Sequence, residues 1–160
     1  MSVGALYQYL PDREAIVAAL SARYHARHEA LMDAMVGELS GRENPDPVGS
    51  VLAAVARLYR EQAGARALRA RLQSAAQLQQ TREHKQRMVA KVQALLATHG
   101  LAGAGDTDRV ARTLFFAADG VMHEAFADDD AGDEVLLAEL DVLLRAYLDA
   151  SQSSNDRPES

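Results

Sequence analysis

The chain has 160 residues, a formal net charge of −6 and no cysteine. This length suits one domain around a single apolar core, and the lack of cysteine excludes disulfides, thiolate metal sites and a thiol nucleophile. No apolar run reaches the roughly 20 residues of a membrane-spanning helix, and residues 1–20 carry no secretory signal. The composition therefore predicts a cytoplasmic protein that does not span a membrane.

The charge is unevenly distributed along the chain. Residues 57–91 hold nine Lys or Arg against two Asp or Glu, whereas residues 106–160 hold four Arg against fourteen Asp or Glu. The net negative charge argues against a chain wrapped in nucleic acid. The basic stretch fits either solvated helix faces or a contact with an anionic ligand or with DNA phosphates.

Apolar residues recur with helical spacing along almost the whole chain, which predicts an all-α fold. A short first helix is expected over residues 3–9, because Pro11 disfavours helical geometry at Leu10. Asp12 is then expected to cap a long second helix that ends near Leu39.

Five more helices are expected after this pair. Gly100 is expected to close one of them, and Asp106 to cap the next. The "DDDAGD" stretch over residues 128–133 is predicted to be a loop, and the polar tail over 151–160 to be disordered. The five helices are expected at residues 48–64, 65–76, 78–99, 106–126 and 133–150.

The last two expected helices indicate a second subunit. The final helix has too many apolar residues for one stripe about 100° wide, namely Leu136, Leu137, Leu140, Val142, Leu143 and Leu144. The helix before it has small residues that would let another helix approach closely, namely Ala111, Ala117, Ala118, Gly120 and Ala125. We expect a homodimer through residues 107–127 and 133–150, and the alternative is a single well-buried central helix.

The opening stretch "SVGALYQYLPDREAIVAAL", residues 2–20, closely resembles the recognition helix and linker helix of the tetracycline-repressor (TetR) family of transcriptional regulators. Leu10 and Ile16 are apolar replacements for the Phe and Leu usual in the family. The positions that match are Ser2, Gly4, Leu6, Tyr7, Tyr9, Arg13 and Glu14. The resemblance implies a TetR-like helical bundle with three parts: a helix-turn-helix remnant over 1–11, a ligand-binding and dimerisation domain over 12–150, and the tail over 151–160.

The residue types of this stretch suit contact with DNA. Ser2 can cap the helix and offer its hydroxyl to a phosphate, and Gly4 lets DNA come close. The residues able to reach base edges in the major groove are Val3, Ala5 and Gln8. Those suited to phosphate contacts, which set position rather than sequence, are Tyr7, Tyr9 and Arg13.

The helices that hold a recognition helix in the groove have no counterpart before this stretch. Either the natural protein starts upstream and this chain is a shortened form, or the short form is genuine and has lost operator binding. We expect this chain alone not to bind operator DNA specifically, and operator DNA to be a partner of the full-length form.

The resemblance also implies a pocket for a small-molecule effector, enclosed by residues 24–126. Met and Phe with a few polar groups suit a mostly apolar ligand. The expected lining residues are Tyr24, His28, Tyr59, Gln62, Met88, Phe115, Phe116, Asp119 and His123. The sequence thus predicts an effector-responsive, homodimeric regulator, expected to be a repressor and to need no cofactor.

Rival functions have weaker support. His25, His28 and Glu29, and the pair His123 and Glu124, could suggest a metal site, but their spacing is not that of a His-Glu-x-x-His motif, so no metal is expected. The sequence offers no convincing acid, base or nucleophile, so no enzyme is expected. The alternative is a ligand-binding or partner-sequestering helical dimer that does not bind DNA.

Overall fold

The computed structural model describes residues 3–39, 46–63, 75–101 and 106–155. These residues form helices α1 (Val3–Leu39), α2 (Pro47–Glu61), α4 (Ala75–His99), α5 (Thr107–Ala125) and α6 (Glu134–Asn155). No strand occurs within these ranges, so the prediction of an all-α fold is confirmed.

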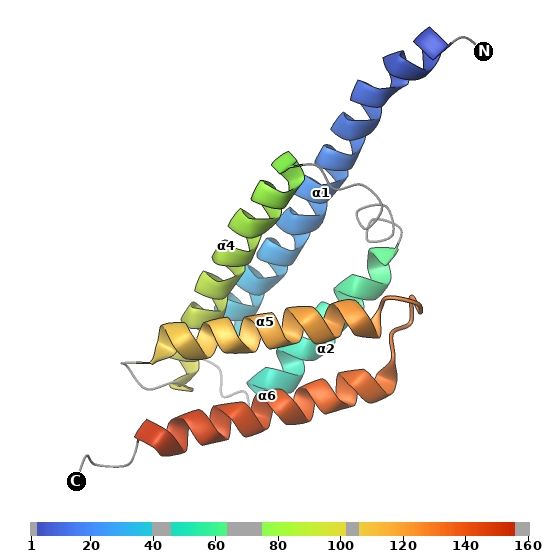
Figure 1. Cartoon of the computed structure of the whole chain (residues 1–160). Helices are drawn as coiled ribbons and strands as arrows, with labels where there is room; N and C mark the ends of the chain where they lie inside the picture. The colour runs from blue at the N-terminus through green and yellow to red at the C-terminus, as the bar shows by residue number, and fades with distance from the viewer. Residues whose placement is uncertain (1–2, 40–45, 64–74, 102–105, 156–160) are drawn as a thin grey trace.

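The helices form two pairs with α2 packed against both (Figure 1). α1 and α4 lie side by side and run in the same direction, whereas α5 and α6 form an antiparallel hairpin that crosses the end of the first pair. α2 contacts α1 and α6, and α4 contacts α5. The main core lies where α2, α4, α5 and α6 meet, around Leu96, Val110, Met122 and Leu140.

The C-terminal end of α4 follows from one glycine. Gly100 has a φ of 61°, a backbone conformation that an L side chain rarely adopts. The N–H of Leu101 donates to the carbonyl of Leu96 at 2.9 Å, and that of Gly100 donates to the carbonyl of Ala97 at 3.3 Å. This is a Schellman ending, so the predicted role of Gly100 is confirmed.

The starts of α2 and α5 differ although an aspartate precedes each helix. The Asp46 carboxylate accepts the N–H of Gly49 at 2.9 Å and caps α2. This hydrogen bond and the nearby Arg145 guanidinium hold the pKa of Asp46 below its ordinary value. Asp106 stands at the N-cap of α5 but makes no capping bond through its side chain. Its carboxylate pairs with Arg109 at 2.7 Å instead, so Asp106 is the N-cap residue as predicted but caps through its backbone position alone.

The predicted break at Pro11 is wrong. α1 is one helix from Val3 to Leu39, so the short helix over 3–9 is its first part and Asp12 lies within it rather than at the start of a second helix. These first turns extend beyond the other described helices in Figure 1. A turn there would need a packed neighbour to hold it, whereas a proline inside a helix removes only one backbone hydrogen bond and adds local strain. Without such a neighbour in the described structure, the helix continues.

Residues 151–155 are helical, although their polar composition predicts disorder. α6 continues to Asn155, so the expectation of a disordered tail is wrong for residues 151–155. Ser151 is buried and its hydroxyl donates to the carbonyl of Leu148, while the Gln152 amide donates to the carbonyl of Leu101. The predicted helix over 65–76 lies outside the described residues except for its last two, which belong to α4.

Candidate functional site

A cavity of about 140 Å³ lies among the five described helices. Its wall is almost wholly apolar, with four polar or titratable side chains, those of His28, Tyr59, His84 and Asp119. The apolar lining includes Leu31 and Met32 of α1, Val48, Val51, Leu52 and Val55 of α2, Met88, Val92, Leu95 and Leu96 of α4, Leu114, Phe115, Ala118 and Met122 of α5, and Leu144 and Leu148 of α6.

Helical spacing explains why one stripe of each helix meets the cavity. On α4, lining residues recur at His84, Met88, Val92 and Leu95, which are three or four positions apart and therefore share one face. Leu144 and Leu148 of α6 show the same spacing. The described lining of the cavity is thus formed mainly by helix faces rather than by loops.

Aromatic rings form one side of the cavity. The ring of His28 stacks on that of Tyr59, with centroids 5.4 Å apart and an interplanar angle of 29°. His28 and His84 are 6.2 Å apart at 24°, and His84 stacks closely on His25 at 4.1 Å and 10°. Behind them, Tyr24 meets His28 edge-on at 4.3 Å. This row of near-parallel rings joins α1, α2 and α4.

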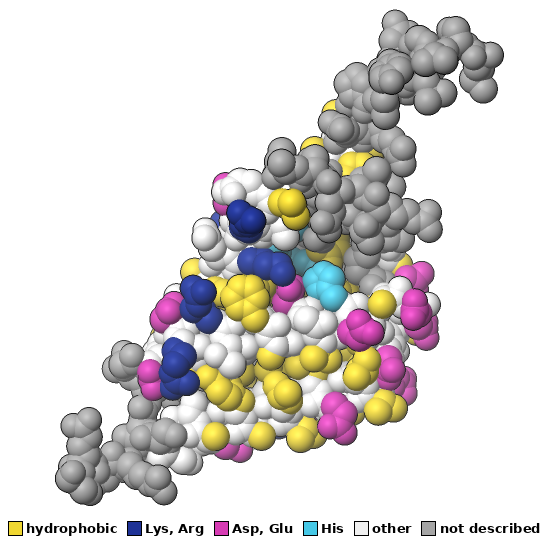
Figure 2. Space-filling view, in the orientation of Figure 1, with side chains coloured by type: hydrophobic (Ala, Val, Ile, Leu, Met, Phe, Trp, Pro, Cys, Tyr) yellow, Lys and Arg dark blue, Asp and Glu magenta, His cyan; other side chains and the backbone are white. Residues whose placement is uncertain are grey.

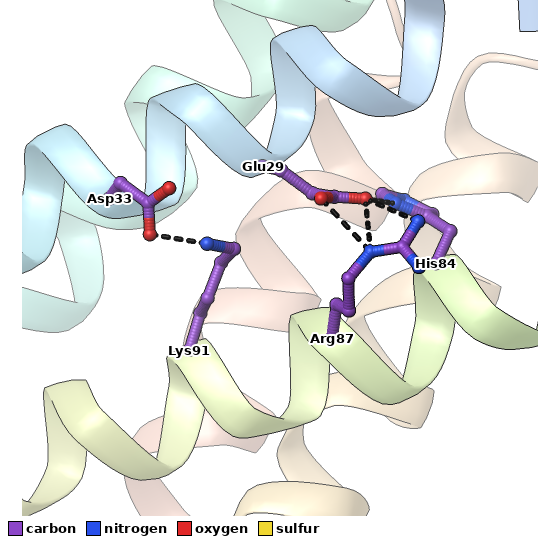
Figure 3. A network of polar contacts seen from close by, with 5 residues as sticks. All are labelled: Glu29, Asp33, His84, Arg87 and Lys91. Carbon is purple, nitrogen blue, oxygen red and sulfur yellow. Dashed lines mark hydrogen bonds and ion pairs between the residues drawn. The ribbon is translucent and has the colours of Figure 1, made fainter. Parts of the chain in front are cut away.

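A polar network links the ring row to the outer seam between α1 and α4 (Figure 3). The Nδ1 atom of His84 donates to Glu29 Oε1 at 2.8 Å, and Arg87 donates to both Glu29 oxygens at 3.0 Å. Partial burial raises the pKa of Glu29, but the hydrogen bonds from His84 and Arg87 outweigh it and bring the pKa below its ordinary value. Lys91 pairs with Asp33 farther along the same seam.

Asp119 contributes a carboxylate to the cavity wall from α5. One of its oxygens accepts from Lys85 at 2.7 Å, and its side chain is 19% exposed. His123, one turn on, donates from Nδ1 to the Asp119 carbonyl at 2.6 Å, and the same nitrogen lies 3.3 Å from the Tyr59 hydroxyl.

The nine residues predicted to bind an effector fall into three groups. Five line the cavity: His28, Tyr59, Met88, Phe115 and Asp119. Tyr24 and Gln62 are buried but do not line it. Phe116 and His123 are about half exposed on the outer side of α5, because a helix turns by about 100° per residue and these two positions fall off the inner face.

Sequence reasoning missed His84 and much of the apolar lining. A usable signal was present, because His84 precedes Met88 by four residues and so shares its face. The same spacing connects His28 to Met32 on α1. Once one residue of a helix is predicted to face inward, the residues three and four positions away can be predicted to face inward too.

The residues predicted to contact DNA all belong to the start of the chain. Ser2 lies outside the described residues. The others stand on the first turns of α1, where the structure describes the backbone alone: Val3, Gly4, Ala5, Tyr7, Gln8, Tyr9 and Arg13. Their contact with DNA stays a prediction.

The residues weighed for a metal site make other contacts instead. His25 and His28 are buried, Glu29 pairs with His84 and Arg87, and His123 faces outward. Within the described ranges, no group of three or more His, Asp or Glu side chains is arranged to hold a metal ion.

A second feature is the outer apolar face, which we define as the exposed apolar side chains of α5 and α6. Figure 2 shows hydrophobic side chains along both helices on the side turned to the viewer. The most exposed large ones are Val135 at 72%, Val142 at 60%, Leu143 at 48% and Phe116 at 47%. Opposite them, Leu140, Leu144 and Leu148 of α6 are buried, so α6 is apolar on two sides as predicted.

Only some of the small residues predicted for a helix contact reach the surface. Ala111 and Ala125 are buried in the core of this chain, and Ala118 lines the cavity, so that part of the prediction is wrong. Small residues in a helix allow close packing on either side, and here they admit helices of the same chain. Gly120 is exposed, and a side chain added there would meet nothing within 4 Å.

Comparison with known proteins assigns the family. None of the described helices is long and apolar enough to cross a membrane. No curated protein and no solved structure matches the chain. The family profile described as tetracyclin repressor-like, C-terminal domain, matches residues 45–148, which include α2, α4, α5 and most of α6. The chain therefore belongs to the tetracycline-repressor (TetR) family, whose members are transcriptional regulators.

Proposed function

We propose that the protein is a homodimeric, effector-responsive transcriptional regulator, acting as a repressor in the cytoplasm without a cofactor. Its cavity is the effector site, and its outer apolar face is the dimer interface. Residues 12–150 form the sensing and dimerising domain, and the first turns of α1 belong to the DNA-reading part.

The apolar cavity is the observation that carries this proposal. Five helices line it, and all but four of its described lining side chains are apolar. Mostly apolar walls with a few placed polar groups are typical of sites that bind small organic molecules. The apolar wall therefore supports the binding of a small organic molecule.

The outer apolar face supports the dimer. Exposed Val135, Val142 and Leu143 follow one another along α6, and leaving such side chains in water forgoes about 1.5–3 kcal/mol each of burial free energy. Contiguous exposed apolar surface marks interaction sites in many proteins. If two copies of the hairpin packed together, each would cover the outer apolar face of the other, since a two-fold interface pairs a surface with itself.

Regulation requires that the effector favour one spacing of the two DNA-reading parts, because a ligand with equal affinity for both states shifts nothing. α1 suits this coupling, since it lines the cavity through His28, Leu31 and Met32 and continues to the predicted DNA-contacting turns. Because those turns continue α1 as one helix, we propose that this chain alone does not bind operator DNA specifically. Nanomolar affinity for a palindromic site in a gel-shift experiment would contradict this.

The unbroken α1 also favours a second candidate, a ligand-binding or partner-sequestering dimer that does not bind DNA. Such a protein would pair with an intact homologue through the same outer apolar face. Mixing it with that homologue distinguishes the two functions, because sequestering would reduce operator binding by the homologue in proportion to the chain added.

Ligand binding is tested by thermal unfolding with a panel of small apolar molecules. A ligand at about 100 times its Kd stabilises a protein by about 2.7 kcal/mol, which corresponds to a Tm increase of about 5–10 °C for a domain of this size. Ala118→Phe should abolish the shift, because Ala118 lines the cavity and the larger ring would occupy it.

The matched control is Ala53→Phe, which places the same ring on the exposed side of α2. This variant should respond to ligand like the wild type. If no molecule of the panel raises Tm, or if Ala118→Phe responds as strongly as the wild type, the cavity is not the effector site.

A further inference from the structure

The ring row forms one wall of the cavity, and this wall favours planar ligands. Tyr59, His28 and His84 all line it, and their planes lie within 24–29° of one another from ring to ring. Phe115 adds a fourth ring from α5. Aromatic rings attract one another by offset stacking or by edge-to-face contact, and a planar ligand can make either contact with such a wall.

The charges of the wall favour a ligand that donates a hydrogen bond. Asp119 is the carboxylate among the described lining residues, and these include no Lys or Arg. An ionised carboxylate only accepts hydrogen bonds. Lys85 pairs with Asp119 but does not line the cavity, and its side chain is 34% exposed. The ion pair with Lys85 offsets the charge of Asp119, but a carboxylate has further acceptor sites, so an O–H or N–H group would meet an acceptor there. An anionic ligand would find no Lys or Arg among the described lining residues.

We propose that the effector is a small planar aromatic molecule with an O–H or N–H group that donates a hydrogen bond to Asp119. This inference rests on the proposed function, since it takes the cavity to be the effector site. The cavity of about 140 Å³ is close in size to an engineered apolar cavity of about 150 Å³ that binds benzene. It therefore suits one aromatic ring or a bicycle of indole size.

Two matched pairs of probes separate the required features in calorimetric titrations of the wild-type chain. Indole and benzofuran have nearly the same shape, but only indole carries an N–H donor. Phenol and cyclohexanol both carry a hydroxyl, but only phenol is planar. We expect indole to bind about tenfold to hundredfold more tightly than benzofuran, which is the usual effect of a hydrogen bond to a charged acceptor. Phenol should bind more tightly than cyclohexanol.

Variants of Asp119 test its role directly. Asp119→Ala should remove the preference for indole while leaving benzofuran affinity unchanged, and Asp119→Asn should restore part of the preference because the amide oxygen accepts a hydrogen bond. Asp108→Ala removes a carboxylate on the same helix that does not line the cavity, and it should keep the preference. Lys85→Gln breaks the ion pair but keeps the acceptor, so it should bind indole at least as tightly as the wild type.

The results separate this inference from the proposed function. Equal binding within both probe pairs, or loss of the preference in Lys85→Gln as large as in Asp119→Ala, overturns the inference. If none of the four probes binds while another molecule of the apolar panel does, the inference is overturned and the effector cavity remains. If the whole panel fails, the proposed function fails with it.

Discussion

The two helix pairs of this molecule differ in the polarity of their outer surfaces. Along the seam of α1 and α4, Glu29 pairs with Arg87 and Asp33 with Lys91, so this surface is polar and suited to water (Figure 3). Along α5 and α6, Val135 and Val142 are largely exposed and the surface is apolar. The first surface is complete in a single chain, whereas the second would gain from a partner.

This difference in polarity bears on how firmly each helix pair is held together. The apolar core holds α5 and α6 together, and the energy of such packing depends on close fit. The seam between α1 and α4 adds ion pairs to its buried contacts, and ion pairs that reach the surface contribute little and are screened by salt. The helix that we propose to transmit the signal, α1, is therefore attached partly by the weaker kind of contact.

The largest effect is expected from placing a charge on the outer apolar face. Val142→Glu should convert the dimer to a monomer at micromolar concentration and raise the dimer Kd about hundredfold or more, because a buried carboxylate without a partner is strongly unfavourable. Analytical ultracentrifugation measures this. Ile16→Glu is the matched control, since Ile16 is 57% exposed on α1 and its variant should remain dimeric. A wild-type chain that sediments as a monomer would remove the difference between the two surfaces.

An intermediate effect is expected at the turn between α5 and α6. Gly132 has a φ of 86°, and an added Cβ would lie 2.6 Å from ring atoms of Phe126. Gly132→Ala should therefore lower the free energy of unfolding by about 2–4 kcal/mol, through strain and overpacking. In contrast, Gly37 is on α1 with nothing within 4 Å of an added Cβ. Gly37→Ala should raise the free energy of unfolding by about 0.5–1 kcal/mol. Urea unfolding distinguishes the two, and similar changes in both variants would contradict the packing of the turn.

The smallest effect is expected at the polar seam, and it depends on pH. Folding lowers the pKa of Glu29 below its ordinary value of 4.5, so its contribution is fully present above that pH and is lost as the pH falls through the folded-state value. Glu29→Gln should cost about 1 kcal/mol of unfolding free energy at neutral pH, and the cost should shrink as the pH falls below 4.5. Unfolding in urea at neutral pH and below pH 4.5 measures the difference.

Asp33→Asn provides the comparison for Glu29→Gln. The Asp33 side chain is 64% exposed, so losing its ion pair with Lys91 should change the free energy of unfolding by less than about 0.5 kcal/mol. An equal loss of unfolding free energy in both variants would mean that the partial burial of Glu29 and its bond to His84 do not contribute to stability.

Helical periodicity predicted most of the fold because it reports burial directly. Apolar spacing located α2, α4, α5 and α6, and Gly100 marked the end of α4 because the backbone there needs a positive φ. The two errors at the ends have a common cause. At Pro11 and in residues 151–155, local residue preference favoured a break or disorder, but the presence or absence of packed neighbours decides the outcome.

The candidate site was harder to predict because adjacent residues of a helix face different environments. Phe115 lines the cavity, whereas Phe116, one residue on, is 47% exposed, and nothing in their chemistry distinguishes them. A small residue such as Ala111 fits either a subunit interface or a core, and here the packing of the neighbouring helices buries it in the core. The spacing from Met88 could place His84 on the inner face of α4, but its stacking on His25 and its bond to Glu29 depend on α4 packing beside α1, which is a long-range contact that periodicity does not report.

α6 has one further consequence, because a single layer of helix separates the cavity from the outside of the molecule. Leu144 and Leu148 form part of the cavity wall, while Val142 and Leu143 point away from it. A molecule that moves this wall also moves the opposite side of the same helix. Occupancy and self-association would then be thermodynamically linked, so that apparent affinity varies with protein concentration and each event changes the other by the same factor.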